Sequence, residues 1–292
     1  MTVPEKSRIP TRGILNADEG LRKFALSRLL PAPELAPYVE HYWQVRWDLR
    51  GLPPYSQTIL SFPSVHLTFE NDNGRLFSGV YGVPRTTYTR RLAGEGFTLG
   101  VKFRPGGFYP FLGEPLSRLT GKTLPIEAVF GEAGAALARD AFAAGEAGEM
   151  VRLAERFLLD RLPPPDPRFD RVRAVVEAAA RERDIVKVAQ LTERFGIAPR
   201  ALQRLFDRYV GVHPKWIIRR FRLQEAAEII ERGEPLDLSA LAAQLGYFDQ
   251  SHFIRDFKAA VGATPKAHAQ RAAAKRADAP SGAAGAPGAP DA

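Results

Sequence analysis

The hydrophobic positions of this 292-residue chain follow two different periods, one after the other. Between residues 38 and 104, short runs rich in β-branched and aromatic residues alternate with polar positions, as in antiparallel strands. Beyond residue 104, apolar residues recur at spacings of three and four, as on the inner faces of helices. The pattern therefore predicts an α+β protein in which a β-rich region precedes a helical one.

The β-rich region is expected to hold several short strands. Tyr38–Leu49 reads as a half-buried strand, and AsnAspAsnGly at 71–74 is a strong hairpin signal. Residues 21–30 fit either a short strand or a helix. Further strands are expected at Gln57–Phe62, Val65–Glu70, Arg75–Val83 and Phe97–Arg104. So many short strands close together indicate a small sandwich or barrel.

A helical extension comes after these strands. It begins at the turn Arg104–Phe108 and continues as helical pieces at 108–112, 114–120, 126–130, 131–143 and 145–162. Pro163-Pro164-Pro165 ends it and stiffens the join to the next domain. The tail is rich in Ala, Gly, Pro and Ser, which favours disorder. We therefore expect a flexible arm at 1–20, an N-terminal domain at 21–162, a second domain at 163–276 and a disordered tail at 277–292.

Two stretches of the second domain share one layout. Val188–Phe206 reads VAQLTERFGIAPRALQRLF, and Leu241–Phe257 reads LAAQLGYFDQSHFIRDF. Each contains a short apolar helix, a glycine at the bend, and a second helix with polar and basic residues between apolar anchors. This is the layout of a helix-turn-helix, whose second helix enters the DNA major groove. A long helix at Pro214–Glu231 would join the two units, giving an all-α double helix-turn-helix domain.

In the first unit, residues 186–195 form the supporting helix and Gly196 bends the chain. Pro199 suits the first turn of the next helix. Leu202, Leu205 and Phe206 form the inward stripe. The outward side chains are Arg200, Gln203, Arg204 and Arg208. Arginine pairs with guanine edges and glutamine with adenine edges, so this face is the candidate reading surface. The alternative is an ordinary solvated face.

The second unit repeats these roles. Residues 238–245 form the supporting helix, and Gly246 bends the chain. Asp249 is a candidate N-cap for a helix at 250–260. Phe253 and Phe257 point inward. The outward side chains are Gln250, Ser251, Ile254 and Arg255, with His252 and Lys258 nearer the phosphate backbone.

The positive charge is concentrated in the same region. The chain carries a net charge of +8, and residues 163–276 contain 21 Lys and Arg against 14 Asp and Glu. A surplus of this kind neutralises DNA phosphates. An arginine-rich codon bias would produce a similar surplus, although residues 1–162 are nearly balanced.

The second domain resembles the AraC/XylS family of bacterial transcription regulators over Phe169–His268. The family pattern, close to IA…GF.D.S.F.R.FK…G.TP, is matched by Leu241-Ala242, Leu245-Gly246-Tyr247, Asp249-Gln250-Ser251-His252-Phe253, Arg255-Asp256-Phe257-Lys258, Gly262 and Thr264-Pro265. Further matches are Pro199-Arg200, Leu202, Arg204, Phe206, Arg222-Leu223 and Ala226. Ala198 departs from the pattern, because the family usually has a serine there. Losing that helix cap costs about 1 kcal/mol, which Pro199 partly offsets.

The resemblance implies a transcription regulator that places two recognition helices in successive major grooves of double-stranded DNA. The first would present Arg200, Gln203 and Arg204, and the second Gln250, Ser251 and Arg255. Contacts with the DNA backbone would come from Lys187, His252 and Lys258. Members of the family usually carry an N-terminal domain that binds a small effector, dimerises, or both. Residues 100–112, GVKFRPGGFYPFL, resemble the β-rich N-terminal domain of an uncharacterised AraC-type subgroup.

Many aromatic residues crowd the N-terminal domain. Aromatic-lined cavities with few polar groups are common ligand sites, although aromatic side chains also build ordinary cores. The candidate effector-binding residues are Tyr42, Trp43, Trp47, Tyr81, Arg85 and Arg104, with the two arginines facing an anionic group.

Nothing in the sequence indicates an enzyme, a metal site or a cofactor. HExxH, P-loop, GxGxxG and GxSxG motifs are missing. His41 and His66 are the only histidines of residues 1–162, and Glu70 would lie about 13 Å from His66 along a strand. The chain has no cysteine, which excludes a fused DNA-repair methyltransferase that needs an acceptor thiol.

Several alternatives stay open at this point. The N-terminal domain could serve only for homodimerisation or contact with RNA polymerase, in a constitutive regulator. The helices could bind proteins, in an adaptor that does not touch DNA. No apolar run is long enough for a membrane span, and the lack of cysteine suits the cytoplasm. The operator, the effector, and activation versus repression are not encoded in any motif.

Overall fold

The computed structural model describes residues 17–60, 62–233 and 237–278. The chain divides into two compact units, Met1–Arg222 and Leu223–Ala292. Most of the expected arm at 1–20 and of the expected tail at 277–292 lies outside the described residues. Within the described part, Ala17–Gly20 form one helical turn, α1.

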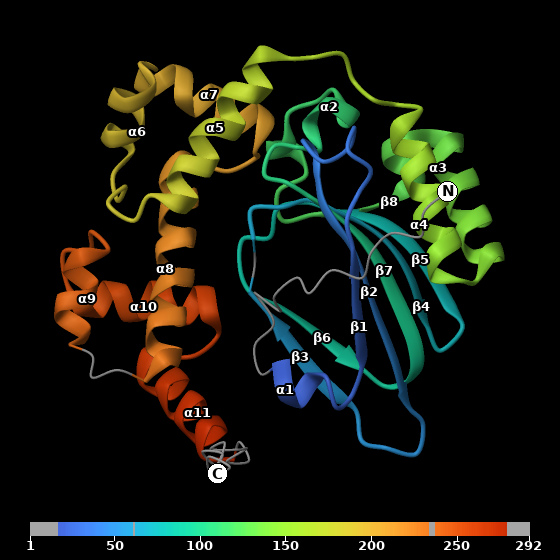
Figure 1. Ribbon diagram of the computed structural model, residues 1–292, viewed down its shortest axis with the longest axis horizontal. Coiled ribbons are helices and arrows are strands. Elements are labelled where there is room, and N and C mark those ends of the chain that lie inside the picture. The colour runs from blue at the N-terminus through green and yellow to red at the C-terminus, as the bar shows by residue number, and fades with distance from the viewer. Residues whose placement is uncertain (1–16, 61, 234–236, 279–292) are drawn as a thin grey trace, which may run out of the picture. The chain divides into compact units, whose positions relative to one another are not determined.

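Two antiparallel sheets form the N-terminal part of the first unit (Figure 1). The larger has the order β1 (Ala25–Leu29), β2 (Val39–Leu49), β7 (Gly94–Phe103), β4 (His66–Asp72), β5 (Arg75–Tyr81) and β8 (Thr123–Pro125). The smaller pairs β3 (Tyr55–Ile59) with β6 (Tyr88–Leu92). The predicted class, a β-rich domain followed by helices, is confirmed.

The β4–β5 hairpin turns where the sequence indicates. Asn73 and Gly74 have φ values of 52° and 82°. Both residues of a type I′ turn need positive φ, which Asn and Gly adopt at the lowest cost. The hairpin then pairs in the register Asp72↔Arg75. Thr68 and Glu70 are two residues apart on β4, so their side chains lie on the same face of the sheet.

Helices cover one face of the larger sheet (Figure 1). They come after α2 (Tyr109–Leu112) and the 3₁₀ turn η1 (Leu116–Arg118), and comprise α3 (Ile126–Ala144) and α4 (Ala147–Leu159). Gly131, with φ 60° and ψ −146°, interrupts α3 between the two helical pieces expected there. Alternate strand residues such as Phe69 and Val101 are fully buried against these helices.

The same hydrophobic core continues into α5 (Pro167–Arg181), α6 (Val188–Phe195) and α7 (Pro199–Tyr209). Tyr38, just before β2, stacks on Phe169 of α5, with ring centroids 5.0 Å apart and planes 18° from parallel. The ring of Tyr109 in α2 lies 4.2 Å from that of Tyr209 at the end of α7. The strands and the first helix-turn-helix are therefore built around one core.

Hydrogen bonds reinforce this joint. The Tyr209 hydroxyl donates to the Asp166 carboxylate at 2.5 Å, and that carboxylate also caps the start of α5 by accepting from the Arg168 amide. The Thr120 hydroxyl donates to the Gly211 carbonyl at 2.7 Å. These contacts hold the C-terminal end of α7 to the start of α5 and to the loop between η1 and β8.

The division between the units falls within α8 (Pro214–Arg232). Leu223 onwards belongs to the second unit, with α9 (Leu238–Gln244), α10 (Gln250–Val261) and α11 (Pro265–Asp278). Its core contains Leu241, Phe253 and Phe257. Among the helices described in either unit, none combines the length and apolarity needed to cross a bilayer.

Candidate nucleic-acid interface and ligand cavity

The first helix-turn-helix has the bend that its sequence predicts, and a side-chain cap at the start of α6 that was not predicted from the sequence. Gly196 adopts φ 59°, the left-handed conformation that ends α6. The Gln190 side chain accepts hydrogen bonds from the amides of Val186 and Lys187 at the start of α6. Ala198 makes no side-chain cap at the start of α7, and Pro199 occupies its first turn.

Helix α7 buries Leu202 and Phe206 and turns its polar side chains outward. Arg200, Gln203 and Arg204 are exposed. Arg208 is also exposed, but its guanidinium lies 5.3 Å from the ring of Tyr109 and donates to that tyrosine's hydroxyl. It therefore joins α7 to the N-terminal domain, whereas the other three face solvent.

The second helix-turn-helix is capped by Asp249. Its carboxylate accepts from the His252 amide at 2.8 Å, as the N-cap prediction requires, and Gly246 bends the chain at φ 77°. Ser251, Arg255 and Lys258 are exposed on α10, as is Lys187 at the start of α6. Gln250 accepts from the Ser239 hydroxyl at 3.2 Å. His252 lies 3.6 Å from the Asp256 carboxylate and packs edge-on against Tyr247.

Phe248 is a surface feature that the sequence pattern did not single out. Its side chain is 100% exposed, directly before the cap of α10. An apolar residue before an N-cap usually packs onto the helix as a staple. Here Tyr247 instead contacts Phe253, with ring centroids 5.5 Å apart, and leaves Phe248 in solvent. In the sequence, the one sign of this exposed residue is its position directly before the N-cap Asp249.

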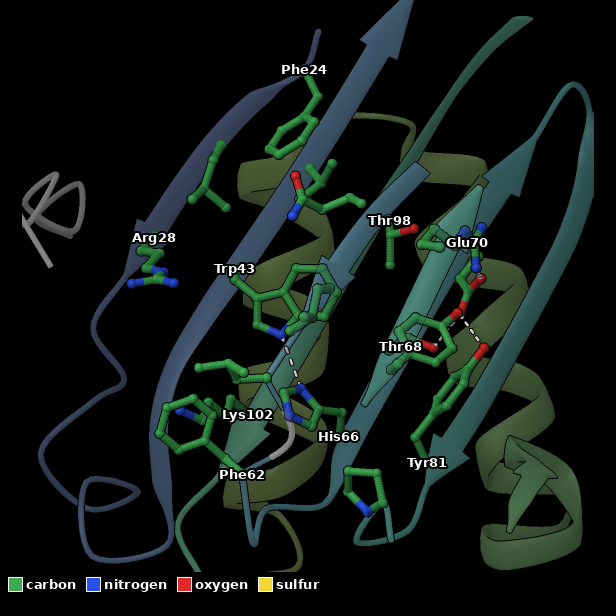
Figure 2. A pocket seen from close by; sticks show the side chains of 18 of the residues that line it. Phe24, Arg28, Trp43, Phe62, His66, Thr68, Glu70, Tyr81, Thr98 and Lys102 are labelled. Carbon is green, nitrogen blue, oxygen red and sulfur yellow. Dashed lines mark hydrogen bonds and ion pairs between the residues drawn. The ribbon is translucent and has the colours of Figure 1, made fainter. Parts of the chain in front are cut away.

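A cavity of about 230 Å³ lies between the two sheets of the N-terminal domain (Figure 2). Trp43, Trp47 and Tyr81 line it, as do β3 and β6 through Ile59 and Tyr88. The remaining effector candidates lie elsewhere. Tyr42 faces the helices and donates to Glu155, Arg104 donates to the Ala36 carbonyl, and Arg85 is exposed.

Two glycines make room for the indole rings that line the cavity. A Cβ on Gly100 would lie 2.3 Å from the Trp43 ring, and one on Gly96 would lie 2.4 Å from the Trp47 ring. Both glycines are opposite their tryptophans in the β2–β7 register. The two indoles therefore lie flat across β7, inside the sandwich.

One end of the cavity is basic. His41, Lys102 and His66 are neighbours across β2, β7 and β4, and Arg28 of β1 lines the same end. The Lys102 ammonium donates to Glu40 at 2.9 Å and lies 4.3 Å from the centroid of Phe62. Burial opposes the charge on Glu40, but hydrogen bonds from His41 and Lys102 outweigh it and lower its pKa to about 2.

The opposite end is a closed network around Glu70. One carboxylate oxygen accepts from Thr68 at 3.0 Å and from Tyr81 at 2.7 Å, and the other pairs with Arg90. Figure 2 shows the Glu70 group set apart from Lys102, Phe62 and His66. The carboxylate is therefore neutralised within the protein.

Two family models match parts of the chain. One, described as a domain of unknown function (DUF6597), matches residues 27–125, which contain most of the two sheets and most of the cavity lining. The other, described as a helix-turn-helix domain, matches residues 191–271 and so covers both units of α6–α7 and α9–α10. No curated protein sequence matches the chain at a significant level.

Several solved structures are similar to it. A probable AraC family transcriptional regulator from Rhodopseudomonas palustris shares 30% identity over 35% of this chain and 97% of its own, with a TM-score of 0.33. The C-terminal domain of AraT, a response regulator from Geobacillus stearothermophilus, shares 22% over 36% and 86%, with a TM-score of 0.32. ToxT from Vibrio cholerae shares 13% over 75% and 93%, with a TM-score of 0.33. The relationship rests on the sequence identity to the first of these, which is covered over nearly its whole length.

Proposed function

Because this chain belongs to the AraC family of transcriptional regulators, we propose that it reads a bipartite operator with both recognition helices, α7 and α10. The family is one of DNA-binding regulators, not enzymes. Each helix would enter a major groove, and the two grooves would follow one another along the duplex. The observation that carries this proposal is that both helices bury an aromatic stripe and expose arginine on the other side.

The base-reading roles fall to the side chains that the fold leaves exposed. Arg200, Gln203 and Arg204 would read one half-site, and Ser251 and Arg255, with Gln250 beside them, the other. Phe248 adds an apolar surface suited to a thymine methyl group. Lys187 and Lys258 are placed for phosphates, with the His252 side chain near them.

Arg208 takes a different role in this proposal. Its contact with Tyr109 makes it a link between α7 and the N-terminal domain rather than a base reader. A regulator needs such a link if a signal in one domain is to change how the other binds DNA.

We further propose that a small effector occupies the cavity and acts on the first helix-turn-helix. Strand β2 begins directly after Tyr38, which stacks on Phe169, and β7 ends directly before Arg104, whose amide donates to the Tyr38 carbonyl. His41 and Lys102 lie on these strand ends and line the cavity. Movement at the basic end would therefore reach α5 through a few residues. Such a regulator would act in the bacterial cytoplasm.

Selection of bound duplexes from a random pool tests DNA reading, using the full-length chain at two salt concentrations. We expect an enriched motif of two halves about one helical turn, roughly 34–36 Å, apart. Phosphate contacts should make the affinity fall with salt, while the motif itself stays the same. A single half-site would leave one helix without a reading role. No enrichment at either salt would contradict the proposal and favour a protein adaptor.

Alanine variants of the two exposed arginines sharpen this test. Arg204→Ala and Arg255→Ala should each lose about 1–3 kcal/mol of preference at one base pair of the selected site. Arg181→Ala is the matched control, because Arg181 is exposed at the end of α5 and belongs to neither recognition helix. Competition binding with single-base operator variants measures the preference. Equal weakening on every sequence would reduce these arginines to phosphate contacts.

A further inference from the structure

The basic end of the cavity holds hydrogen-bond donors that the protein leaves available. Trp43 donates to Nδ1 of His66 at 3.2 Å, so the proton of neutral His66 is on Nε2. Burial lowers the pKa of His66 to about 3, which keeps the ring neutral. Of the residues that the structure describes, none accepts a hydrogen bond from that Nε2. A ligand in the cavity could accept a hydrogen bond from this donor.

Lys102 lies beside His66 in the sheet register and also has spare capacity. An ammonium group has three N–H donors, and Glu40 is the one carboxylate among the described residues that Lys102 contacts. Phe62 covers another side of the ammonium through its ring face. Burial lowers the pKa of Lys102, as expected for a charge with too few partners.

The charges that line the cavity favour an anion over a cation. Among the described residues that line it, three are cationic, Arg28, Arg90 and Lys102, and one is a carboxylate, Glu70. Both oxygens of Glu70 are already bonded, so a cationic ligand would have to displace Arg90. An anion at Lys102 and His66 displaces no such network. It competes only with Glu40.

The side chains that line the cavity and its volume limit the size and shape of the apolar part of the ligand. A cavity of about 150 Å³ lined by apolar side chains accommodates benzene. The present cavity, of about 230 Å³, therefore fits one or two fused rings with a short substituent. The flat indoles of Trp43 and Trp47 offer stacking surfaces for such rings.

We propose that the cavity binds a small aromatic carboxylate, with its ring against Trp43 and its carboxylate on Lys102 and His66. This inference rests on the proposed role of the cavity as an effector site. The carboxylate takes a charge-assisted hydrogen bond from the ammonium and a neutral one from the imidazole. Glu40, at the β-bulge between Val39 and His41, then shares Lys102 with the ligand.

Two matched series of probes test the sign of the charge with the full-length protein. The first is indole-3-acetate, indole-3-acetamide and tryptamine, and the second is phenylacetate, phenylacetamide and phenethylamine. Within a series the ring is constant and only the charge changes. Calorimetric titration should show each acid binding at least about tenfold more tightly than its amide, since a hydrogen bond to a charged group is worth about that much. Acids no tighter than amides, or amines tightest, would overturn the proposal.

Variants locate the carboxylate. Lys102→Met should remove the tenfold preference for acids, whereas Arg46→Met should keep it, because Arg46 is exposed on β2 and lies outside the cavity lining. Lys102→Met leaves Glu40 short of a partner. The double variant Lys102→Met/Glu40→Gln removes both charges and gives the same loss if the single variant folds poorly. Glu40→Gln alone should tighten acid binding.

The outcomes separate this inference from the proposed function. An unchanged acid preference in Lys102→Met, when the protein folds, would overturn the anion site. Enrichment of a bipartite operator without any acid preference would leave the DNA-binding role standing and reject the ligand class. Loss of both would reject the regulator itself.

Discussion

Replacing Arg222 with alanine is expected to lower the free energy of unfolding of the first unit by about 3–5 kcal/mol. Arg222 is only 1% exposed, although it carries a charge. Its guanidinium donates to the carbonyls of Ala179 at 2.8 Å and Glu182 at 3.2 Å, at the end of α5. The Ala179 carbonyl is one of the last four of the helix, which lack intrahelical partners, and the cation also complements the helix dipole. Alanine would remove the donor to the buried Ala179 carbonyl and leave a cavity beside it.

Denaturant unfolding of Arg222→Ala against the parent protein measures this loss. Lys215→Ala is the control on the same helix, because Lys215 is exposed, and it should change stability by less than about 0.5 kcal/mol. Arg222→Lys should recover part of the loss, since lysine keeps the charge but not the forked geometry. A loss below about 1 kcal/mol in Arg222→Ala would mean that water replaces the guanidinium at the α5 carbonyls.

The second large effect is expected from Gly107→Ala, at about 3 kcal/mol of lost stability. A Cβ at Gly107 would lie 2.2 Å from the carbonyl oxygen of Tyr38 and 2.9 Å from its carbonyl carbon. These are backbone atoms, which cannot rotate aside as the end of a side chain can. The segment holding Tyr38 would have to move, and Tyr38 is the residue that stacks on Phe169. The variant should therefore weaken the joint between the strands and α5.

Gly113→Ala is the matched control for this variant. Gly113 has φ 74°, so alanine there costs about 1–2 kcal/mol in backbone conformation, but its Cβ would meet nothing within 4 Å. Thermal and denaturant unfolding of both variants separate strain from collision. Equal losses would show that Tyr38 and Gly107 do not approach closely in solution. A larger loss in Gly107→Ala, with a cleavage site for protease appearing near Tyr38, is the expected result.

Features set by neighbouring residues could be predicted from the sequence. The Asn73–Gly74 turn, the bends at Gly196 and Gly246, and the Asp249 cap all depend on the φ preference or side chain of one or two residues. Such local chemistry is visible in a short window. The inward stripes of α7 and α10 arise in the same way from helical spacing.

The ligand cavity depends on features that a short window does not contain. Tyr42 and Trp43 are adjacent aromatics of similar size, yet the pleat of β2 sends one to the helices and the other to the cavity. The sequence alone favours Arg104 over Lys102, because the partners of Lys102, His41 and His66, come from other strands. Strand β6 carries Thr89, Arg90 and Arg91 and has little apolar alternation, so its sequence resembles a loop. The direction of Trp43, the partners of Lys102 and the existence of β6 all depend on how the strands pair, which a local sequence pattern does not show.

The core that the strands share with α5–α7 limits how a gene of this kind could recombine. A crossover at Pro163–Pro165 would place Tyr38 and Tyr109 opposite the α5 and α7 of another protein, without Phe169 and Tyr209 to receive them. An exchanged N-terminal domain would have to bring its own first helix-turn-helix. The tolerated junction then lies inside α8, next to Arg222, where the compact units divide. One helix-turn-helix unit would be inherited with the N-terminal domain, and the other with the remainder of the chain.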